Sequence, residues 1–336
     1  MKSTARQVAQ FKTMMITVVV CTYNRCQLLP QALESIARSR LRESVEWEIL
    51  VVDNNSRDQT REVVVDLSHR YPGRFRYFFE PRPGKSHALN SAIREARGQI
   101  LAFMDDDATV DPAWLQNLTG CLENGPCAGV GGRTLASRPV SLPPWLALKG
   151  PYGMGGILGA LFDLGDTPCD LKEPPFGTNM AFRKDVFEKY GGFRTDLGPR
   201  PGCLIRNEDT ELGRRLLAAG ERLWYEPSAV VYHPLTEGRL QKGYILAWHF
   251  DLGRAEVREI GPRPDIWGIP RPYLTLLKAV LGTMPSRILL WMFAWNSQRR
   301  FYLKARVWEA AGQTREIYQR WFSRKPLREI DAPSPQ

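Results

Sequence analysis

Short apolar runs, four in all, alternate with segments of helical spacing over about the first 120 residues, and this alternation constrains the fold most. The apolar runs, most of them rich in β-branched or aromatic residues, lie at 15–21, 48–52, 75–79 and 100–104. Runs without apolar–polar alternation are typical of strands buried on both faces of a parallel sheet. Helices are predicted between them at 28–38, 58–67 and 86–96. The sequence therefore predicts an α/β fold, with a mostly parallel, doubly wound sheet and helices on both faces.

Three adjacent carboxylates, Asp105, Asp106 and Asp107, follow the fourth run. Because adjacent carboxylates repel one another, this arrangement is costly without a cation. Oxygen-rich sites with few histidines suit hard divalent cations such as Mg²⁺ or Mn²⁺. The carboxyl end of a strand in an open α/β sheet is also where such sheets bind ligands. The alternative is a solvated acidic turn before a helix that begins at Asp111-Pro112.

Polar residues also follow the first two runs, at 22–25 and at Asp53. Parallel strands end at the same edge of a sheet, so we expect these residues and the acidic triplet to lie along one edge, where a nucleotide binds. A GxGxxG motif does not follow the first strand, and the sequence contains no GxxxxGK[ST] motif. The sequence thus argues against dinucleotide-binding and P-loop folds.

The chain is less regular after residue 127. A strand is predicted at 128–132, a return to the sheet at 176–182, and a helix at 184–190 that two glycines close. Between them, 139–165 is rich in Pro and Gly, which predicts a long loop with short helical pieces. Loops of this length in a domain are often functional lids.

Glu208 and Asp209 are expected in the first turn of a helix with Asn207 as its N-cap. An acidic first turn is also ordinary capping, because carboxylates stabilise the positive end of the helix dipole. The last strand, 223–232, ends at His233. A single histidine at a strand end is more often a surface or hydrogen-bonding residue than a metal ligand.

The net charge of +10 is concentrated in the C-terminal third of the chain. From Arg239 onward there are 17 Lys and Arg against 8 Asp and Glu, a surplus of nine. This excess indicates an anionic partner surface, either membrane or nucleic acid. No zinc-finger or RRM signature is present, so no nucleic acid is expected as a partner. The apolar run at 14–21 is too short to span a membrane and lacks signal-peptide flanks.

The six cysteines are scattered and form no CxxC pair. A zinc site requires tighter spacing. We expect reduced thiols in a cytosolic protein rather than disulfides.

The C-terminal third is predicted to be helical. A long helix is expected at 240–260, with four residues facing inward: Tyr244, Leu246, Ala247 and Phe250. After a proline-rich link at 261–272, charged residues and a proline interrupt the apolar stretch 274–295, so no clean transmembrane span is expected. Its tryptophans precede a basic cluster: Arg299, Arg300, Lys304 and Arg306. This pattern fits an interfacial membrane helix on an anionic surface, and the alternative is a helical hairpin packed on the domain or in a homodimer.

Six motifs, spread over residues 15–235, occur in a characteristic order: CTYNR, DNNSRDQT, PGKSHALN, DDD, FGTNMAFRK and NEDTELGRRLLAAG. Each is weak alone, but together they resemble glycosyltransferase family 2, the inverting nucleotide-sugar enzymes with the GT-A fold. The resemblance implies a metal-dependent hexosyltransferase (EC 2.4) that uses Mn²⁺ or Mg²⁺. It implies transfer of a single sugar from a nucleotide-diphosphate sugar to a hydroxyl of a glycan or polyprenyl-linked glycolipid, in bacterial cell-surface polysaccharide synthesis.

The resemblance also implies a role for each motif residue. The implied nucleotide-binding residues are Thr22, Tyr23, Asn24, Arg25, Asp53, Asn55, Lys85, Asn90, Asp105 and Asp106. The implied metal ligands are Asp107, Asp105 and His233, and the triplet leaves open whether Asp105 or Asp106 joins Asp107 on the metal. The implied catalytic base is Asp209, with Glu208 as the alternative, and the sugar or acceptor is expected at Gly177, Thr178 and Asn179.

Two departures from the family pattern bear on these expectations. Asn207 stands where many relatives have Gly, and Ile317 replaces the Gln of the QxxRW motif of processive relatives, which favours single-sugar transfer. A nucleotidylyltransferase and a non-catalytic nucleotide-sugar-binding membrane scaffold are the rival functions. We expect a cytoplasmic protein, peripheral on the inner membrane. The expected divisions are a tail (1–14), a GT-A domain (15–238, with halves 15–125 and 126–238), a helical extension (239–326) and a flexible tail (327–336).

Overall fold

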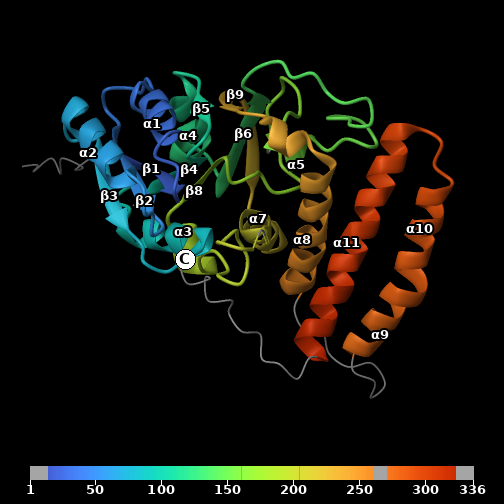
Figure 1. Ribbon diagram of the computed structural model, residues 1–336. Helices are drawn as coiled ribbons and strands as arrows, with labels where there is room; N and C mark the ends of the chain where they lie inside the picture. Colours follow the sequence, from blue (N-terminus) through green and yellow to red (C-terminus); the bar gives the residue numbers. More distant parts are fainter. Residues whose placement is uncertain (1–13, 160, 204, 261–270, 323–336) are drawn as a thin grey trace, which may run out of the picture.

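A nine-stranded sheet forms the centre of the structure (Figure 1). The computed structural model describes residues 14–159, 161–203, 205–260 and 271–322. The strand order is β3-β2-β1-β4-β8-β6-β9-β5, and β7 pairs with β9. The strands are β1 (Met15–Thr22), β2 (Glu46–Asp53), β3 (Phe75–Phe79), β4 (Ile100–Asp105), β5 (Thr109–Val110), β6 (Gly129–Ala136), β7 (Cys169–Asp170), β8 (Asn179–Arg183) and β9 (Leu223–His233).

The four predicted N-terminal strands are confirmed, each within two residues at its ends, and β1 to β4 pair in parallel. The centre of β1 shows why its run has no polar alternation. Ile16, Val18, Val19 and Val20 are at most 1% exposed, because both faces of the strand are covered.

The second half of the sheet mixes directions. Strand β8 lies between β4 and β6 and is antiparallel to both, whereas β6 and β9 are parallel. The predicted return to the sheet at 176–182 is therefore confirmed as a strand that begins three residues later, at Asn179. The mostly parallel α/β sheet predicted from sequence is correct, with this antiparallel strand inserted near its middle.

Helices cover both faces of the sheet and bury two separate hydrophobic clusters. One cluster joins the sheet to α1, α2 and α4, and the other joins it to α3, α6 and α7. These helices are α1 (Leu29–Ala37), α2 (Thr60–Arg70), α3 (Lys85–Glu95), α4 (Trp114–Asn124), α6 (Asp185–Tyr190) and α7 (Glu208–Ala218). In the predicted glycine-rich loop, Gly155–Gly159 forms the short helix α5.

The C-terminal helices stand beside the α/β layers (Figure 1). They are α8 (Lys242–Ile260), α9 (Arg271–Lys278), a π-helical segment (Ala279–Thr283), α10 (Met284–Met292) and α11 (Ser297–Trp321), with a short 3₁₀ turn (Glu237–Leu240) before α8. Within the described ranges, no helix has both the length and the apolar character needed to cross a membrane.

The predicted inward face of α8 is right only in part. Tyr244 and Leu246 are partly buried and pack against a hydrophobic cluster. Ala247 is exposed and Phe250 is only partly buried, whereas Ile245 and His249 are buried. The reason is a close crossing with α11 at two glycines. A Cβ at Gly253 would overlap the Glu309 carbonyl, and a Cβ at Gly312 would overlap the Phe250 carbonyl. The backbone contact turns α8 toward α11 in a way that apolar spacing alone does not indicate.

Replacing Gly253 or Gly312 by Ala is expected to destabilise the protein by about 1–3 kcal/mol or more, because the added methyl group meets backbone rather than a movable side chain. Thermal unfolding of each variant measures this effect. Gly243→Ala on the same helix is the control, since no atom lies within 4 Å of its added Cβ. If Gly253→Ala and Gly312→Ala have the same melting temperature as Gly243→Ala, then α8 and α11 do not cross this closely.

One cysteine prediction is wrong. Cys121 and Cys127 form a disulfide, because the end of α4 and the start of β6 bring their Cα atoms to 6.2 Å. The other four cysteines are free, as expected. The predicted tails and most of the proline-rich link fall on 1–13, 261–270 and 323–336, outside the described residues.

Candidate active site

The site forms where β1, β2 and β4 end. Thr22 of β1 is in register with Asp53 of β2, and Cys21 is in register with Asp105 of β4. The sheet thus brings the polar residues that follow three strands to one edge, as the sequence predicted.

Basic side chains of the chain itself surround the acidic triplet. Lys85 Nζ lies 2.6 Å from Asp105 Oδ1. Arg25 Nη1 donates to Asp106 Oδ1 at 2.8 Å and to Asp107 Oδ2 at 2.9 Å. Part of the repulsion between the three carboxylates is therefore offset by Lys and Arg.

The environments of the three carboxylates differ. Burial alone would raise the pKa of Asp105, but Lys85 and His233 outweigh it and hold this pKa well below its usual range. Burial raises the pKa of Asp106 to about 6, despite the nearby Arg25. Asp105 is therefore kept ionised, whereas Asp106 is closer to neutrality.

Asp105, Asp107 and His233 each offer one ligand atom, and these atoms lie within 4.8 Å of one another. Asp107 Oδ1 is buried without a hydrogen-bond partner in the described part of the chain, and His233 Nε2 lies 3.3 Å from it. Two carboxylates and an imidazole fit a divalent cation. Asp106 is not in this group: Arg25 pairs with both Asp106 and Asp107, whereas His233 lies beside Asp107.

A cavity of about 380 Å³ lies against the triplet on the side of β1. Of the predicted nucleotide-binding residues, it is lined by Thr22, Tyr23, Arg25, Lys85, Asp105 and Asp106. Residues that the sequence analysis did not identify also line it: Asn54, Arg200, Arg206 and Arg239. Five basic side chains among these residues, together with the carboxylate group, make the cavity suitable for a phosphate-bearing ligand that also binds a cation.

Other predicted nucleotide-binding residues do not line this cavity and instead fix the loops around it. Asp53 accepts hydrogen bonds from the Tyr77 hydroxyl (2.7 Å) and the Ser56 amide (2.9 Å). The Asn90 side chain bonds to the backbone of Phe193.

Asn24 and Asn55 have left-handed backbones, with φ of 51° and 67°. Asn tolerates this conformation better than other residues with a side chain. The Asn24 side chain also accepts a hydrogen bond from the Arg57 amide. The left-handed backbone of the turns after β1 and β2 therefore explains why Asn stands at both positions.

A second cavity, of about 300 Å³, contains the acidic pair at the start of α7. Glu208, Asp209, Gly177 and Thr178 line it, whereas Asn179 does not. The Asn179 amide is engaged by the Trp114 indole and two backbone carbonyls. The two cavities share lining residues and are therefore adjacent: Lys85, Asp105, Pro199, Arg206 and Arg239.

Asp209 is held at the cavity by backbone amides. Its Oδ2 accepts from the Gly177 amide at 2.6 Å, and its Oδ1 accepts from the Thr210 amide at 2.7 Å. Asn207 occupies the N-cap position, as predicted, but its side chain makes no capping bond. Its left-handed backbone, with φ of 75°, directs the side chain toward Glu259 instead.

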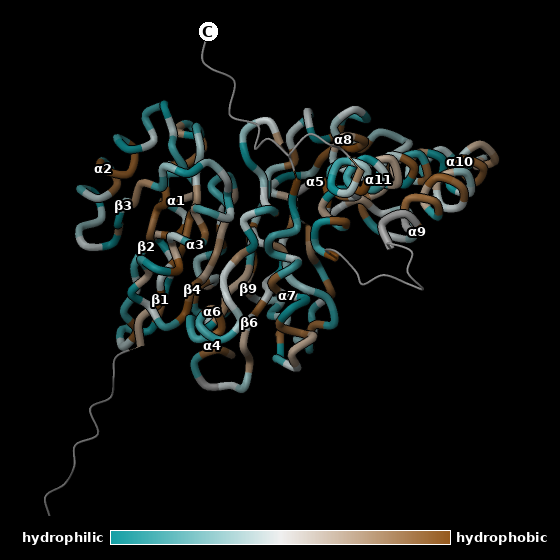
Figure 2. Tube along the Cα trace, turned by 90° about the horizontal axis from the view of Figure 1, so that it is seen from below, coloured by the Kyte–Doolittle hydropathy of each residue, from teal (hydrophilic) through white to brown (hydrophobic). Residues whose placement is uncertain are grey.

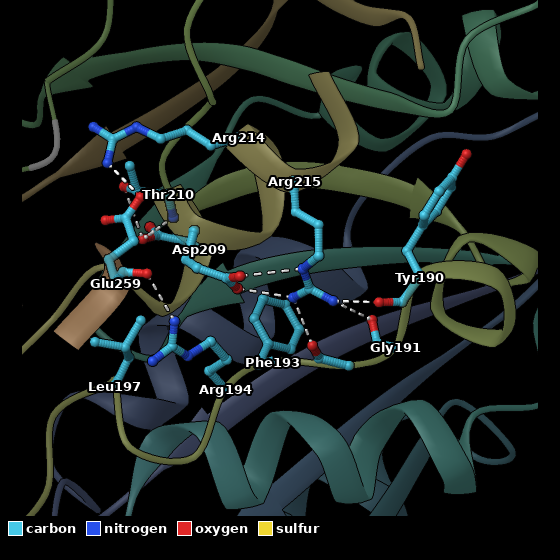
Figure 3. A network of polar contacts seen from close by, with 12 residues as sticks. Tyr190, Gly191, Phe193, Arg194, Leu197, Asp209, Thr210, Arg214, Arg215 and Glu259 are labelled. Carbon is cyan, nitrogen blue, oxygen red and sulfur yellow. Dashed lines mark hydrogen bonds and ion pairs between the residues drawn. The ribbon is translucent and has the colours of Figure 1, made fainter. Parts of the chain in front are cut away.

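Arginines of α7 tie this helix to its neighbours (Figure 3). Arg215 donates to the carbonyls of Tyr190 and Gly191, and Arg214 reaches Glu259 at 2.6 Å. This network links α7 to the loop after α6 and to the C-terminal end of α8. The acidic pair is thus fixed from three elements.

Burial and the neighbouring Asp209 raise the pKa of Glu208 to about 7. Between pH 4.5 and 7 the folded protein then binds more protons at Glu208 than the unfolded chain does, so this group lowers the unfolding free energy as pH rises.

Glu208→Gln is expected to stabilise the protein by about 1–3 kcal/mol at pH 8 and by little at pH 4.5. Thermal melts at both pH values measure this, with the exposed Glu173→Gln as control. Equal melting temperatures of Glu208→Gln and wild type at pH 8 would contradict the cost of burying the ionised Glu208 carboxylate.

Arg239 and Trp248 are functional-site residues that sequence reasoning missed. Arg239 Nη2 lies 3.4 Å from Asp107 Oδ2, and Trp248 lines the second cavity. Both follow the last strand, outside the six motifs. The basic excess that begins at Arg239 was the available signal for one of them.

The comparisons with known proteins agree with this geometry. Residues 17–191 match the family model described as glycosyl transferase family 2. The chain is 27% identical to the succinoglycan biosynthesis protein ExoM of Rhizobium meliloti, over 74% of this chain and 75% of that protein. It is also 27% identical to a glucosyl-dolichyl phosphate glucuronosyltransferase of Haloferax volcanii, over 71% of this chain and 75% of that protein.

Among solved structures, the mannosyltransferase PcManGT from Pyrobaculum calidifontis, in complex with GDP-Man and Mn²⁺, shares the fold. The TM-score is 0.56 at 21% sequence identity, over 89% of this chain and 86% of that chain. GalNAc-T7 with UDP, GalNAc and Mn²⁺ has a TM-score of 0.53 at 15% identity, over 76% of this chain and 53% of that chain. The matched segment covers more than half of the chain and contains the acidic triplet, and the chain belongs to glycosyltransferase family 2.

Proposed function

We propose that the protein transfers a single sugar, most simply a hexose, from a nucleotide-diphosphate sugar to a hydroxyl of a glycan or polyprenyl-linked glycolipid, with inversion. The observation that carries this proposal is the adjacency of the two cavities. One has basic side chains, and the other has the carboxylate of Asp209. The carboxylate–imidazole group lies where they meet, because Asp107 lines the first cavity, His233 lines the second and Asp105 lines both. Sugar transfer needs both: a site for the diphosphate and a base for the acceptor.

In this mechanism the acceptor oxygen attacks the anomeric carbon while Asp209 takes the hydroxyl proton. The bond between the anomeric carbon and the diphosphate oxygen breaks, and the nucleoside diphosphate leaves. Lys85, Arg206 and Arg239 line both cavities and stabilise the negative charge that develops on the leaving group. A divalent cation held by Asp105, Asp107 and His233 would neutralise further charge there.

Asp209 is favoured as the base over Glu208. Glu208 is 4% exposed, and its pKa of about 7 leaves much of it protonated at neutral pH. Asp209 is less buried, and the Gly177 and Thr210 amides donate to its carboxylate and so hold it at the cavity.

Incubation with a panel of nucleotide sugars and product identification test the proposed function. Free nucleoside diphosphate together with a glycosylated acceptor is expected. Release of pyrophosphate would indicate a nucleotidylyltransferase, and nucleotide-sugar binding without turnover would indicate a non-catalytic scaffold.

The C-terminal helices support a further partner, an anionic membrane surface on which the protein binds peripherally. Helix α10 lies at the outer edge of the molecule, and Figure 2 shows hydrophobic stretches along it. Large apolar side chains are exposed from the π-helical segment to the turn before α11: Leu281, Leu289, Leu290, Met292, Phe293 and Trp295. Trp295 is 96% exposed, and Arg299 and Arg300 beside it are exposed as well. An apolar face next to cationic side chains is typical of interfacial binding.

Phe293→Ala with Trp295→Ala is expected to weaken binding to vesicles that contain phosphatidylserine at least tenfold, because both side chains would leave water on binding. Vesicle flotation measures this, with the exposed pair Phe79→Ala and Leu164→Ala as the matched control. Equal flotation of both double variants would contradict membrane binding through this face. A change from dimer to monomer in the first variant would instead assign the face to a homodimer.

A further inference from the structure

A fully buried carboxylate, that of Glu316 in α11, pairs with arginines outside both cavities. The Nε atoms of three arginines donate to it at 2.7, 3.1 and 3.2 Å, and these are, in that order, Arg258, Arg254 and Arg320. Burial alone would raise the pKa of Glu316, but Arg258 and Arg254 outweigh burial and lower this pKa. Because an ionised carboxylate is costly to bury unless it is paired, the three guanidinium groups are held firmly at this point.

Two of these arginines extend from Glu316 to the loop between α6 and α7. Arg258 Nη1 donates to the Asp196 carbonyl at 2.8 Å, and Arg320 Nη2 donates to Asp196 Oδ2 at 3.2 Å. Arg254 reaches Asp251 on its own helix instead, at 2.9 Å. The cluster therefore joins α8 and α11 to residues 194–203, a segment called here the 194–203 loop.

The 194–203 loop forms part of the wall of the first cavity. Four consecutive residues of the loop line that cavity: Pro199, Arg200, Pro201 and Gly202. Arg200 and Cys203 exchange two backbone hydrogen bonds, each of 2.9 Å, which close the tip of the loop into a tight turn. The Lys85 amide donates to the Pro199 carbonyl at 2.9 Å, and the Lys85 ammonium pairs with Asp105. A shift of the loop would therefore change the cavity and its cationic lining.

Further contacts hold the loop against α8. Leu197 and Ile205, on either side of the tight turn, share a small buried cluster with Ala255 of α8. Arg194 donates to the Glu259 carbonyl near the end of α8, at 3.1 Å (Figure 3). The position of the turn thus depends on the C-terminal helices, which lie beyond the segment that matches the family model.

We propose that Arg258 and Arg320 are positioning residues of the first cavity. Held by Glu316, they fix the 194–203 loop against the cavity before the nucleotide binds. A ligand loses affinity when the wall that it contacts must be ordered on binding, so tight nucleotide binding requires the C-terminal helices. The inference rests on the proposed function, because it takes a nucleoside diphosphate as the ligand of this cavity.

Titration calorimetry of the full chain with UDP and with GDP, in the presence of Mn²⁺, tests the proposal. Arg320→Met is expected to weaken the binding of whichever nucleoside diphosphate the wild type binds by about fivefold or more, and Arg258→Met by at least as much. Arg254→Met is the matched control and should keep the wild-type affinity within about twofold. Arg254 and Arg320 are 19% and 20% exposed and donate to Glu316 at 3.1 and 3.2 Å, so similar falls in melting temperature are expected for these two variants.

A loss of stability alone would affect Arg320→Met and Arg254→Met alike, so equal nucleoside diphosphate affinities for these two variants overturn the proposal. Arg320→Lys keeps the positive charge and should recover part of the affinity. In transfer assays Arg320→Met should raise the donor KM and leave kcat within about twofold. A wild type that binds a nucleoside diphosphate but transfers no sugar overturns the proposed function, while the calorimetric comparison still decides this inference. A wild type that binds neither UDP nor GDP overturns both.

Discussion

Asp209→Asn is expected to lower the rate of sugar transfer by roughly 10²- to 10⁴-fold, the usual contribution of a positioned general base. Asn cannot take the acceptor proton, yet its side-chain oxygen can still accept from the Gly177 amide, so the cavity should keep its shape. Nucleoside diphosphate affinity is therefore expected to stay within about twofold. Steady-state kinetics and titration calorimetry on the same preparation measure the two quantities.

Two variants make the Asp209 result decisive. Asp185→Asn, at a side chain that is 64% exposed on α6, is the control for a lost carboxylate and should leave transfer unchanged. Glu208→Gln removes the neighbouring carboxylate. Near-normal transfer by Asp209→Asn excludes Asp209 as the base, and a large loss confined to Glu208→Gln would assign the proton transfer to Glu208.

Asp107→Asn is expected to weaken Mn²⁺ binding in the presence of nucleoside diphosphate by roughly 10- to 100-fold or more, the range seen even for residues that only support a metal ligand. Its Oδ1 is buried, has no hydrogen-bond partner among the described residues, and lies beside His233. Electron paramagnetic resonance of free Mn²⁺ measures the affinity. Transfer should fall in parallel, because the leaving diphosphate loses a stabilising charge.

Asp106→Asn is the matched control for this prediction, because Asp106 is the adjacent carboxylate and pairs with Arg25 rather than with His233. A much smaller effect on Mn²⁺ affinity is expected. If Asp106→Asn loses Mn²⁺ and Asp107→Asn retains it, the ligand assignment within the triplet is wrong.

The N-terminal half of the fold could be predicted because its strands can be recognised from their own residues. Each of the first four strands is rich in apolar residues and recognisable from its own sequence, and the parallel register then brings Thr22 and Asp105 to one edge. The position of β8 between β4 and β6 was not predictable in this way, because strand order depends on pairings between distant segments.

The site was predicted where the motifs follow strands and missed where it depends on long-range packing. Arg239 lines both cavities from the turn before α8, and Trp248 lines the second from α8 itself. Helix α8 packs on α11 through Gly253 and Gly312, a contact between backbones that has no periodic signal. Asn90, by contrast, lies in a motif, yet its side chain bonds to the backbone of Phe193. A motif position identifies a segment near the site and leaves the contacts of each side chain to the tertiary structure.

The measurement that tests the central claim most directly is the anomeric configuration of the glycosidic bond formed from an α-linked nucleotide-sugar donor, followed by proton NMR during the reaction. A single in-line displacement with Asp209 as base predicts a β-linked product and one equivalent of nucleoside diphosphate. An α-linked product would contradict the mechanism, and release of pyrophosphate would contradict sugar transfer itself.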